Sequence, residues 1–182
     1  MTDMTELFES PAAGFDDPIE ILDGCHHRIR RNCACIERIV AHVAKQGADE
    51  EARIAAASVL RYFDTAGRDH HRDEEDDLFP ALYREAPPAG RPGVERLLER
   101  LRADHRVLDA LWERVRPALE AITQGRDPGL TAGLAALFTE TFTQHIACEE
   151  TELLPLARRL LSPATLSRLG VAMAARRGVS YG

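Results

Sequence analysis

The sequence has few aromatic residues, no excess of basic residues and no long uncharged apolar run. Aromatic residues make up 5% of the 182 residues, and the formal net charge is -7. This charge offers no broad basic surface for nucleic acid or an anionic membrane. A membrane-spanning helix needs roughly 18 consecutive apolar residues, and a secretory signal needs a basic segment before an apolar one. The sequence therefore predicts a cytoplasmic protein that binds neither nucleic acid nor a membrane.

Cysteine is also scarce. Disulfide frameworks are typical of small secreted scaffolds without a core, whereas a chain of 182 residues can bury a core of its own. Reduced thiols are therefore expected. We interpret the two cysteines that directly precede His26 and Glu149 as packing residues rather than redox groups. The cysteines are Cys25, Cys33, Cys35 and Cys148.

Helix-forming residues are abundant, and runs of β-branched residues are rare. Proline and glycine divide the chain into segments whose apolar residues recur at helical spacing. Asp17 and Glu20 resemble a capping box, and Asp127-Pro128 resembles the start of another helix. The predicted helices cover residues 17–46, 49–85, 94–124 and 127–161, followed by a short helix over 163–178.

These lengths predict an all-α fold, an up-down-up-down four-helix bundle with a short C-terminal fifth helix. Three regions are expected along the chain. Residues 1–15 form a flexible N-terminal tail, residues 16–161 form the bundle, and residues 162–182 form the short helix and a tail.

Each predicted long helix has a stripe of apolar residues that is expected to face the bundle interior. Polar residues interrupt all four stripes at the same level. The first and third helices each place one histidine there, and the second and fourth each place a histidine four residues before a glutamate. The four segments form an internal repeat, which indicates two similar hairpins around a pseudo-twofold axis. The inward polar residues are His26, His70, Glu74, His105, His145 and Glu149.

The repeat also separates these residues from neighbouring histidines. His27 and His71 could form alternative pairs by spacing alone, but Arg106 and Ile146 stand at their matched positions. We therefore expect His27 and His71 on the flanks of the helices. The acidic run 73–77 is interpreted as a solvated helix face apart from Glu74, although an iron entry path is the alternative. Pro80 and Pro155 are expected to kink their helices.

Two buried carboxylates would cost several kcal/mol each without a positive charge beside them, and no Lys or Arg occupies the inward stripes. A metal cation would supply that charge. Residues i and i+4 lie on one helix face, so each His-Glu pair can bind a common centre. Mixed imidazole and carboxylate ligands suit iron, with zinc or manganese as possible substitutes. If both glutamates bridge two ions that also share an oxo or hydroxo bridge, about two of twelve coordination positions remain open.

The order of these residues resembles the haemerythrin-like family of HHE cation-binding domains, over residues from about 17 to 161. The stretch HHRDEEDDLFPAL resembles the signature of its second helix. The resemblance implies a non-haem di-iron centre that binds dioxygen, nitric oxide or peroxide. Family roles include oxygen carriage, oxygen or iron sensing, and repair of iron-sulfur centres. Asp109 departs from the oxygen-carrier pattern, which has a second histidine there, and this argues against dedicated oxygen storage.

The sequence leaves several readings open. Beyond the metal site there is no acid-base or nucleophilic group of residues, so any turnover would be metal chemistry. A metal- or oxygen-responsive sensing or interaction module without turnover is the alternative. A purely structural bundle, with zinc or without metal, is a third interpretation. A homodimer is possible.

Overall fold

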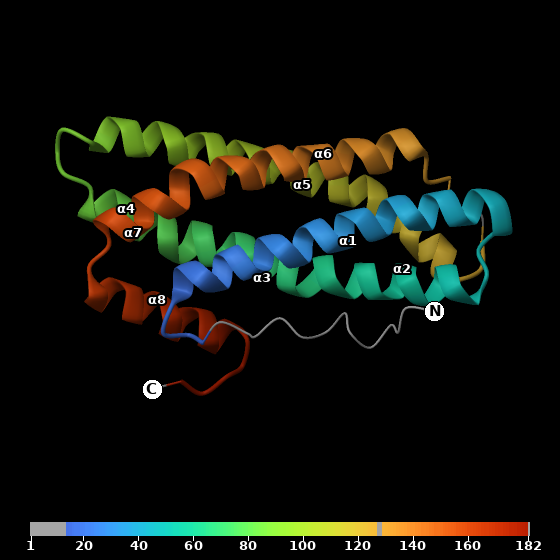
Figure 1. Cartoon of the computed structure of the whole chain (residues 1–182), viewed down its shortest axis with the longest axis horizontal. Coiled ribbons are helices and arrows are strands. Elements are labelled where there is room, and N and C mark those ends of the chain that lie inside the picture. The colour runs from blue at the N-terminus through green and yellow to red at the C-terminus, as the bar shows by residue number, and fades with distance from the viewer. Residues whose placement is uncertain (1–13, 127–128, 182) are drawn as a thin grey trace.

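The computed structural model describes residues 14–126 and 129–181, which form four long helices and a shorter fifth, with no strand among them. Two of the long helices contain π-helical turns, labelled η. The four long helices run side by side along the long axis of the molecule, and the last helix packs near one end (Figure 1). The predicted bundle with a fifth helix is confirmed. The elements are α1 (Pro18–Gln46); α2 (Glu50–Tyr62), η2 (Phe63–Gly67), α3 (Arg68–Arg72), η3 (Asp73–Leu78) and α4 (Phe79–Glu85); α5 (Arg91–Thr123); α6 (Ala132–Cys148), η4 (Glu149–Leu153) and α7 (Leu154–Leu160); and α8 (Pro163–Arg176).

The start of α1 agrees with the predicted N-cap. The Asp17 side chain accepts hydrogen bonds from the backbone N–H groups of Ile19 and Glu20, at 3.1 and 3.0 Å. These bonds satisfy two N–H groups that have no partner inside the helix. The backbone N–H of Asp17 donates to the carbonyl of Gly14, which takes the place of the Glu20 side chain in a complete capping box. Gly47 ends the helix with a φ of 77°, a conformation that glycine adopts without strain.

Two helix starts differ from the prediction. α5 begins at Arg91 rather than near residue 94, because Pro92 is tolerated in a first turn whose N–H groups are unpaired. α6 begins at Ala132, later than predicted, and the Thr131 side chain caps it by accepting from the N–H of Leu134 at 3.1 Å. The predicted start at Asp127-Pro128 lies outside the described residues, as do residues 1–13 of the predicted tail.

Two apolar clusters fill the bundle, one on each side of a polar layer. The first is built around α2, α5 and α6 and includes Ile29, Phe63, Leu108 and Phe142. The second gathers side chains of α4, α7 and α8 against the starts of α1 and α5. Burying each large apolar side chain contributes about 1.5–3 kcal/mol, so the clusters hold the four helices in register on both sides of the layer.

The π-helical turns η3 and η4 each end just before a proline. Pro80 and Pro155 lack the N–H that an α-helix uses at that position, and their rings crowd the preceding turn. The residue before each proline donates across a wider turn instead: Phe79 N–H to the carbonyl of Glu74, and Leu154 N–H to the carbonyl of Glu149. The irregularities expected at the two prolines therefore take the form of π-helical turns that begin at or next to a buried glutamate.

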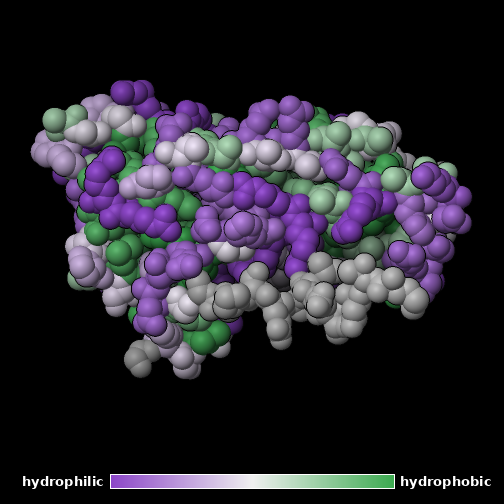
Figure 2. All heavy atoms as spheres, viewed as in Figure 1, coloured by the Kyte–Doolittle hydropathy of each residue, from purple (hydrophilic) through white to green (hydrophobic). Residues whose placement is uncertain are grey.

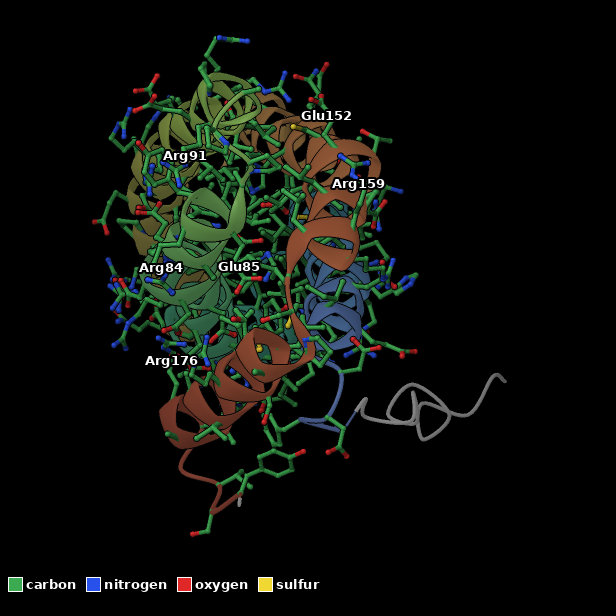
Figure 3. The ribbon with its side chains drawn as sticks, turned by 90° about the vertical axis from the view of Figure 1, so that its left-hand side faces the viewer. Arg84, Glu85, Arg91, Glu152, Arg159 and Arg176 are labelled. Carbon is green, nitrogen blue, oxygen red and sulfur yellow. The ribbon has the colours of Figure 1, made fainter. Side chains whose placement is uncertain are left out.

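The acidic run 73–77 is not a uniformly solvated face, contrary to the prediction. The side chain of Asp73 is fully buried and forms ion pairs with Arg176 and Arg177 of the C-terminal segment, while Arg176 also reaches Asp77 at 2.7 Å. The prediction fails because α8 folds back onto η3, which the helical period of one segment cannot reveal. In Figure 3, which views one end of the bundle, α8 lies below the four long helices, where it contacts η3 and α1.

The face of the molecule shown in Figure 2 is mostly polar. Hydrophilic side chains predominate on it, and hydrophobic ones form separated patches. Over the described residues, no helix combines the length and the apolar character needed to span a membrane.

Candidate metal centre

The fold brings all six predicted inward polar residues together between the two apolar clusters. Each is at most 2% exposed. They come from the four long helices, so no single hairpin contains the whole set. The residues are His26 of α1, His70 of α3, Glu74 of η3, His105 of α5, His145 of α6 and Glu149 of η4.

The six side chains form two overlapping groups that share both glutamates. One group contains His26 and His70, the other contains His105 and His145, and within each group one ligand atom per residue lies within 4.8 Å of all the others. Glu149 reaches across both groups. Its two carboxylate oxygens lie 3.1 Å from His26 Nε2 and 3.0 Å from His145 Nε2.

Glu74 occupies the corresponding place between the two groups. Its oxygens lie 3.8 Å from His70 Nε2 and 3.3 Å from His105 Nε2. Each carboxylate thus has one oxygen facing one pair of imidazoles and one facing the other. This arrangement suits two cations bridged by carboxylates.

The inward-facing atoms of this set are buried and have no hydrogen-bond partner among the described residues. They are the Nε2 atoms of the four histidines and both oxygens of each glutamate. Buried polar groups without partners are rare, because each costs about 1–3 kcal/mol, or more when it is charged. The donor set therefore fits a metal cation, which would bind these lone pairs and offset the carboxylate charges.

Carboxylates outside this set face the Nδ1 atoms of His105 and His26. His105 Nδ1 lies 2.6 Å from Glu75, and His26 Nδ1 lies 3.3 Å from Glu150, which is held by Arg30 at 2.7 Å. A carboxylate accepts a hydrogen bond from Nδ1–H, which keeps the proton on Nδ1 and leaves the Nε2 lone pair facing inward. Neither Glu75 nor Glu150 was among the predicted site residues, although both lie in the repeated Glu-Glu pairs that could have identified them.

Burial and neighbouring charges shift the pKa values of the two glutamates in opposite directions. Burial, followed by the charge of Glu149, raises the pKa of Glu74 to about 8. Burial would also raise the pKa of Glu149, but His145, His105 and His26 outweigh it and hold this pKa well below its usual value. Burial opposes protonation of His105 as well, yet Glu149 and Glu74 raise its pKa to about 10. Without a cation, protons held by Glu74 and His105 thus offset part of the negative charge of the cluster.

The two flanking histidines behave differently from each other. The side chain of His27 is 74% exposed, as predicted for a flank. His71 is only 15% exposed, and its ring stacks on that of His105 with 4.0 Å between the centroids. The expected flanking position of His71 is therefore wrong.

A pocket of about 420 Å³ lies beside the cluster. Its apolar wall includes Phe63, Leu108, Trp112 and Phe142, and its polar lining includes His71 and Glu75, both of which contact His105. A small molecule in this pocket would lie next to the residues that surround the buried set.

Comparison with known proteins agrees with this geometry. Residues 17–157 match the hemerythrin HHE cation binding domain. The chain belongs to this family. A protein of Haemophilus influenzae, described only as an uncharacterized protein, is 30% identical over 167 residues, which cover 92% of this chain and 94% of the relative.

Membership of the haemerythrin HHE family accounts for the all-α fold and indicates cation binding. The matched region contains all six buried residues of the set. Their individual roles as metal ligands, the identity of the metal and the number of ions stay predictions.

Proposed function

We propose that this haemerythrin-like domain holds two iron ions in its core and binds or processes dioxygen, nitric oxide or peroxide there. The terminal ligands would be His26 and His70 at one ion and His105 and His145 at the other. Glu74 and Glu149 would bridge the two. The observation that carries the proposal is the buried set of unpartnered nitrogen and oxygen atoms, which divides into two groups with both glutamates in common.

The surrounding residues prepare the ligands. Glu75 and Glu150 hold His105 and His26 through Nδ1, so the Nε2 lone pairs point inward without further rearrangement. The two apolar clusters keep water away from the centre and fix the four helices that carry the ligands. The mixed nitrogen and oxygen set suits iron.

Two iron ions at this position would supply redox chemistry and open coordination positions for a small molecule. The pocket beside His71, with a volume of about 420 Å³, offers space for a small molecule next to the centre. Its lining combines aromatic residues such as Phe63 and Trp112 with charged residues such as Arg68 and Glu113.

Metal analysis tests the proposal directly. Protein purified without air should contain about two irons per chain and should gain near-ultraviolet absorption of a ferric pair when air is admitted. Glu149→Gln should lower the iron content, because both groups use Glu149. Glu152→Gln is the matched control, because Glu152 lies on the same π-helical turn but is 51% exposed and pairs with Arg100. Stoichiometric zinc that is indifferent to air, or no metal at all, would overturn the proposal.

One contact favours a second candidate, a metal-responsive module without turnover. Asp73, next to Glu74, binds Arg176 and Arg177 near the end of α8. Metal occupancy at Glu74 would then influence how firmly α8 is held, and a partner could detect the change. A large rise in melting temperature with iron, together with the absence of peroxide or nitric oxide turnover, would support this candidate over the first.

A further inference from the structure

The pocket beside His71 collects much of the aromatic content of the chain. The sequence contains six Phe, three Tyr and one Trp, and four of these ten rings line this one pocket. Phe63 lies at the centre of the group, with its ring centroid 4.9 Å from that of Trp112 and 5.2 Å from that of Phe138. The ring of Phe142 is 5.6 Å away. Aromatic rings gathered around a hollow offer favourable contacts to another flat ring.

The backbone beside the pocket is irregular in a way that proline does not explain. The π-helical turn η2 supplies Phe63 and Gly67 to the pocket wall, and no proline follows it as Pro80 and Pro155 follow the other two turns. A Cβ atom on Gly67 would lie 3.2 Å from Cδ1 of Phe63, closer than packed side chains normally approach. Single π-helical turns are frequent at functional sites. Both features leave room in the pocket.

The size of the pocket indicates a ligand larger than a diatomic gas. Its volume of about 420 Å³ lies within the usual range for small-molecule sites, about 300–1,000 Å³. A water molecule occupies about 30 Å³ in the liquid, so dioxygen or peroxide alone would leave most of the pocket to water. None of the described residues that line it is one of the six proposed metal ligands. A molecule in the pocket therefore lies beside the centre, separated from the metal ions by His71 and Glu75.

Charged groups at the edge of the pocket favour a ring that carries hydroxyl groups. Glu113 and Asp109 of α5 and Arg68 of α3 line the pocket and are exposed. Within the part of the chain that the structure describes, neither Glu113 nor Arg68 forms a hydrogen bond or an ion pair. A carboxylate only accepts hydrogen bonds and a guanidinium only donates them, whereas a hydroxyl does both. An uncharged hydroxyaromatic molecule can therefore bond to either group while its ring contacts the aromatic wall.

His71 connects the pocket with the proposed centre. It lines the pocket, and its ring stacks on that of His105 with 4.0 Å between the centroids and 14° between the planes. His105 is a proposed ligand of one iron. Electrons pass readily between aromatic rings in contact, whereas an atom would need an open path to the metal. The arrangement therefore suits a molecule that exchanges electrons with the centre without binding to it.

We infer that this pocket binds a single-ring hydroxyaromatic electron donor of the hydroquinone class. The inference rests on the proposed di-iron function. One hydroquinone loses two electrons and two protons as its two O–H bonds break, and it becomes a quinone. The electrons pass through His71 and His105 and reduce two ferric ions to two ferrous ions. The protons leave to water at the exposed edge of the pocket near Glu113, and no atom is transferred to the metal.

The tryptophan of the pocket reports binding, because the chain contains no other. The indole N–H of Trp112 donates to Asp64 at 3.0 Å and gives a single indole cross-peak in a proton–nitrogen correlation spectrum. Titration of the metal-free protein with hydroquinone should shift this cross-peak until the shift saturates. Cyclohexanediol, the saturated counterpart of hydroquinone, keeps the hydroxyl groups but lacks the aromatic ring, and it should give no saturable shift.

A pair of neighbouring substitutions on α5 tests the polar edge of the pocket. Glu113→Ala should weaken hydroquinone binding about fivefold, because it removes a charged hydrogen-bond acceptor. Arg114→Ala is the matched control, since Arg114 is also exposed but does not line the pocket. Both are surface changes that should leave the fold intact. A shift that does not saturate, or that hydroquinone and cyclohexanediol produce alike, would overturn the inference.

Reduction of the iron-loaded protein tests the electron route. In the absence of air, hydroquinone should remove the ferric absorption at a rate that saturates over the concentrations found in the titration. His71→Leu should keep the indole shift but slow this reduction severalfold. His27→Leu, at a position 74% exposed, should match wild type. Saturable binding without reduction would overturn the electron-donor role. Saturable binding in a protein that takes up no iron would instead contradict the proposed function, and the reduction step with it, while the binding site stands.

Discussion

The fully buried carboxylate of Asp73 accepts a hydrogen bond of 2.6 Å from the guanidinium of Arg177, which lies 104 residues further along the chain. Arg176 binds the other oxygen of the same carboxylate. This contact links the C-terminal segment to the π-helical turn that carries Glu74. Burial raises the pKa of Asp73 more than Arg177 and Arg176 lower it, so the carboxylate needs both arginines to stay ionised.

Removing one of these partners should destabilise the fold. Arg177→Ala leaves a buried carboxylate with one arginine, and we expect the free energy of unfolding to fall by about 2 kcal/mol, the usual contribution of a hydrogen bond to a charged group. Urea denaturation of the metal-free protein measures this. Arg159→Ala, an exposed position on α7 labelled in Figure 3, is the control and should change stability by less than about 0.5 kcal/mol. Equal effects from the two substitutions would show that Asp73 does not need Arg177.

The stability of the metal-free protein should fall as the pH rises above 6.5. The folded state keeps a proton on Glu74 up to a pKa of about 8, whereas the unfolded chain releases it near 4.5. Stability from this proton is therefore complete below pH 4.5 and is lost as the pH rises towards 8. His105 acts with the same sign between 6.5 and about 10. Burial lowers the pKa of His70, which acts with the opposite sign, but only below pH 6.5.

Melting temperatures at pH 6.5 and 8, measured with a chelator present, check this expectation. Glu74→Gln keeps the shape of the side chain but carries no titrating proton, so its decrease between the two pH values should be smaller than that of wild type. The same decrease in both proteins would assign the pH dependence to other groups.

Glu75 should control metal affinity without contacting the metal. It accepts from His105 Nδ1 at 2.6 Å, and loss of such an orienting carboxylate typically costs 10- to 100-fold in affinity. We therefore expect Glu75→Gln to weaken binding by roughly that factor in a chelator competition. Glu99→Gln, at an exposed position of α5, should leave the affinity unchanged. A Glu75→Gln protein with wild-type affinity would rule out this role for Glu75.

The four cysteines are free, and their reactivity should follow their burial. Burial raises the pKa of Cys33 to about 12 and also raises the pKa of Cys25, so neither thiol forms much reactive thiolate at pH 8. Cys35 is only partly buried. Alkylation at pH 8 followed by mass spectrometry should label Cys35 well before Cys25 and Cys33. Rapid labelling of Cys33 in the folded protein would contradict the packing described for α1.

Helical periodicity together with the internal repeat was sufficient to identify the fold and the six buried polar residues, because these depend on which face of a helix a residue occupies. His26 and His105, for example, replace an apolar residue in an otherwise regular stripe. Periodicity could not place His71, since its position next to His105 depends on how α3 packs against α5. The repeat even argued against it through Ile146, so the two hairpins differ at this position.

Other features depend on contacts between distant segments. The burial of Asp73 requires α8, and the π-helical turns before Pro80 and Pro155 require a backbone that widens instead of bending. Segment by segment, these residues have the pattern of a solvated acidic face and of two helix kinks. Only the packed structure shows that Asp73 is buried and that the helices widen into π-helical turns before the two prolines.

The pairing of Asp73 with the C-terminal arginines also implies an order in which the protein assembles. Asp73 is synthesised 103 and 104 residues before Arg176 and Arg177. Until those arginines leave the ribosome, burying Asp73 would strand a charge in the interior. We therefore expect the second long helix to reach its final position only after α8 docks, so that the side of the bundle next to Asp73 closes last.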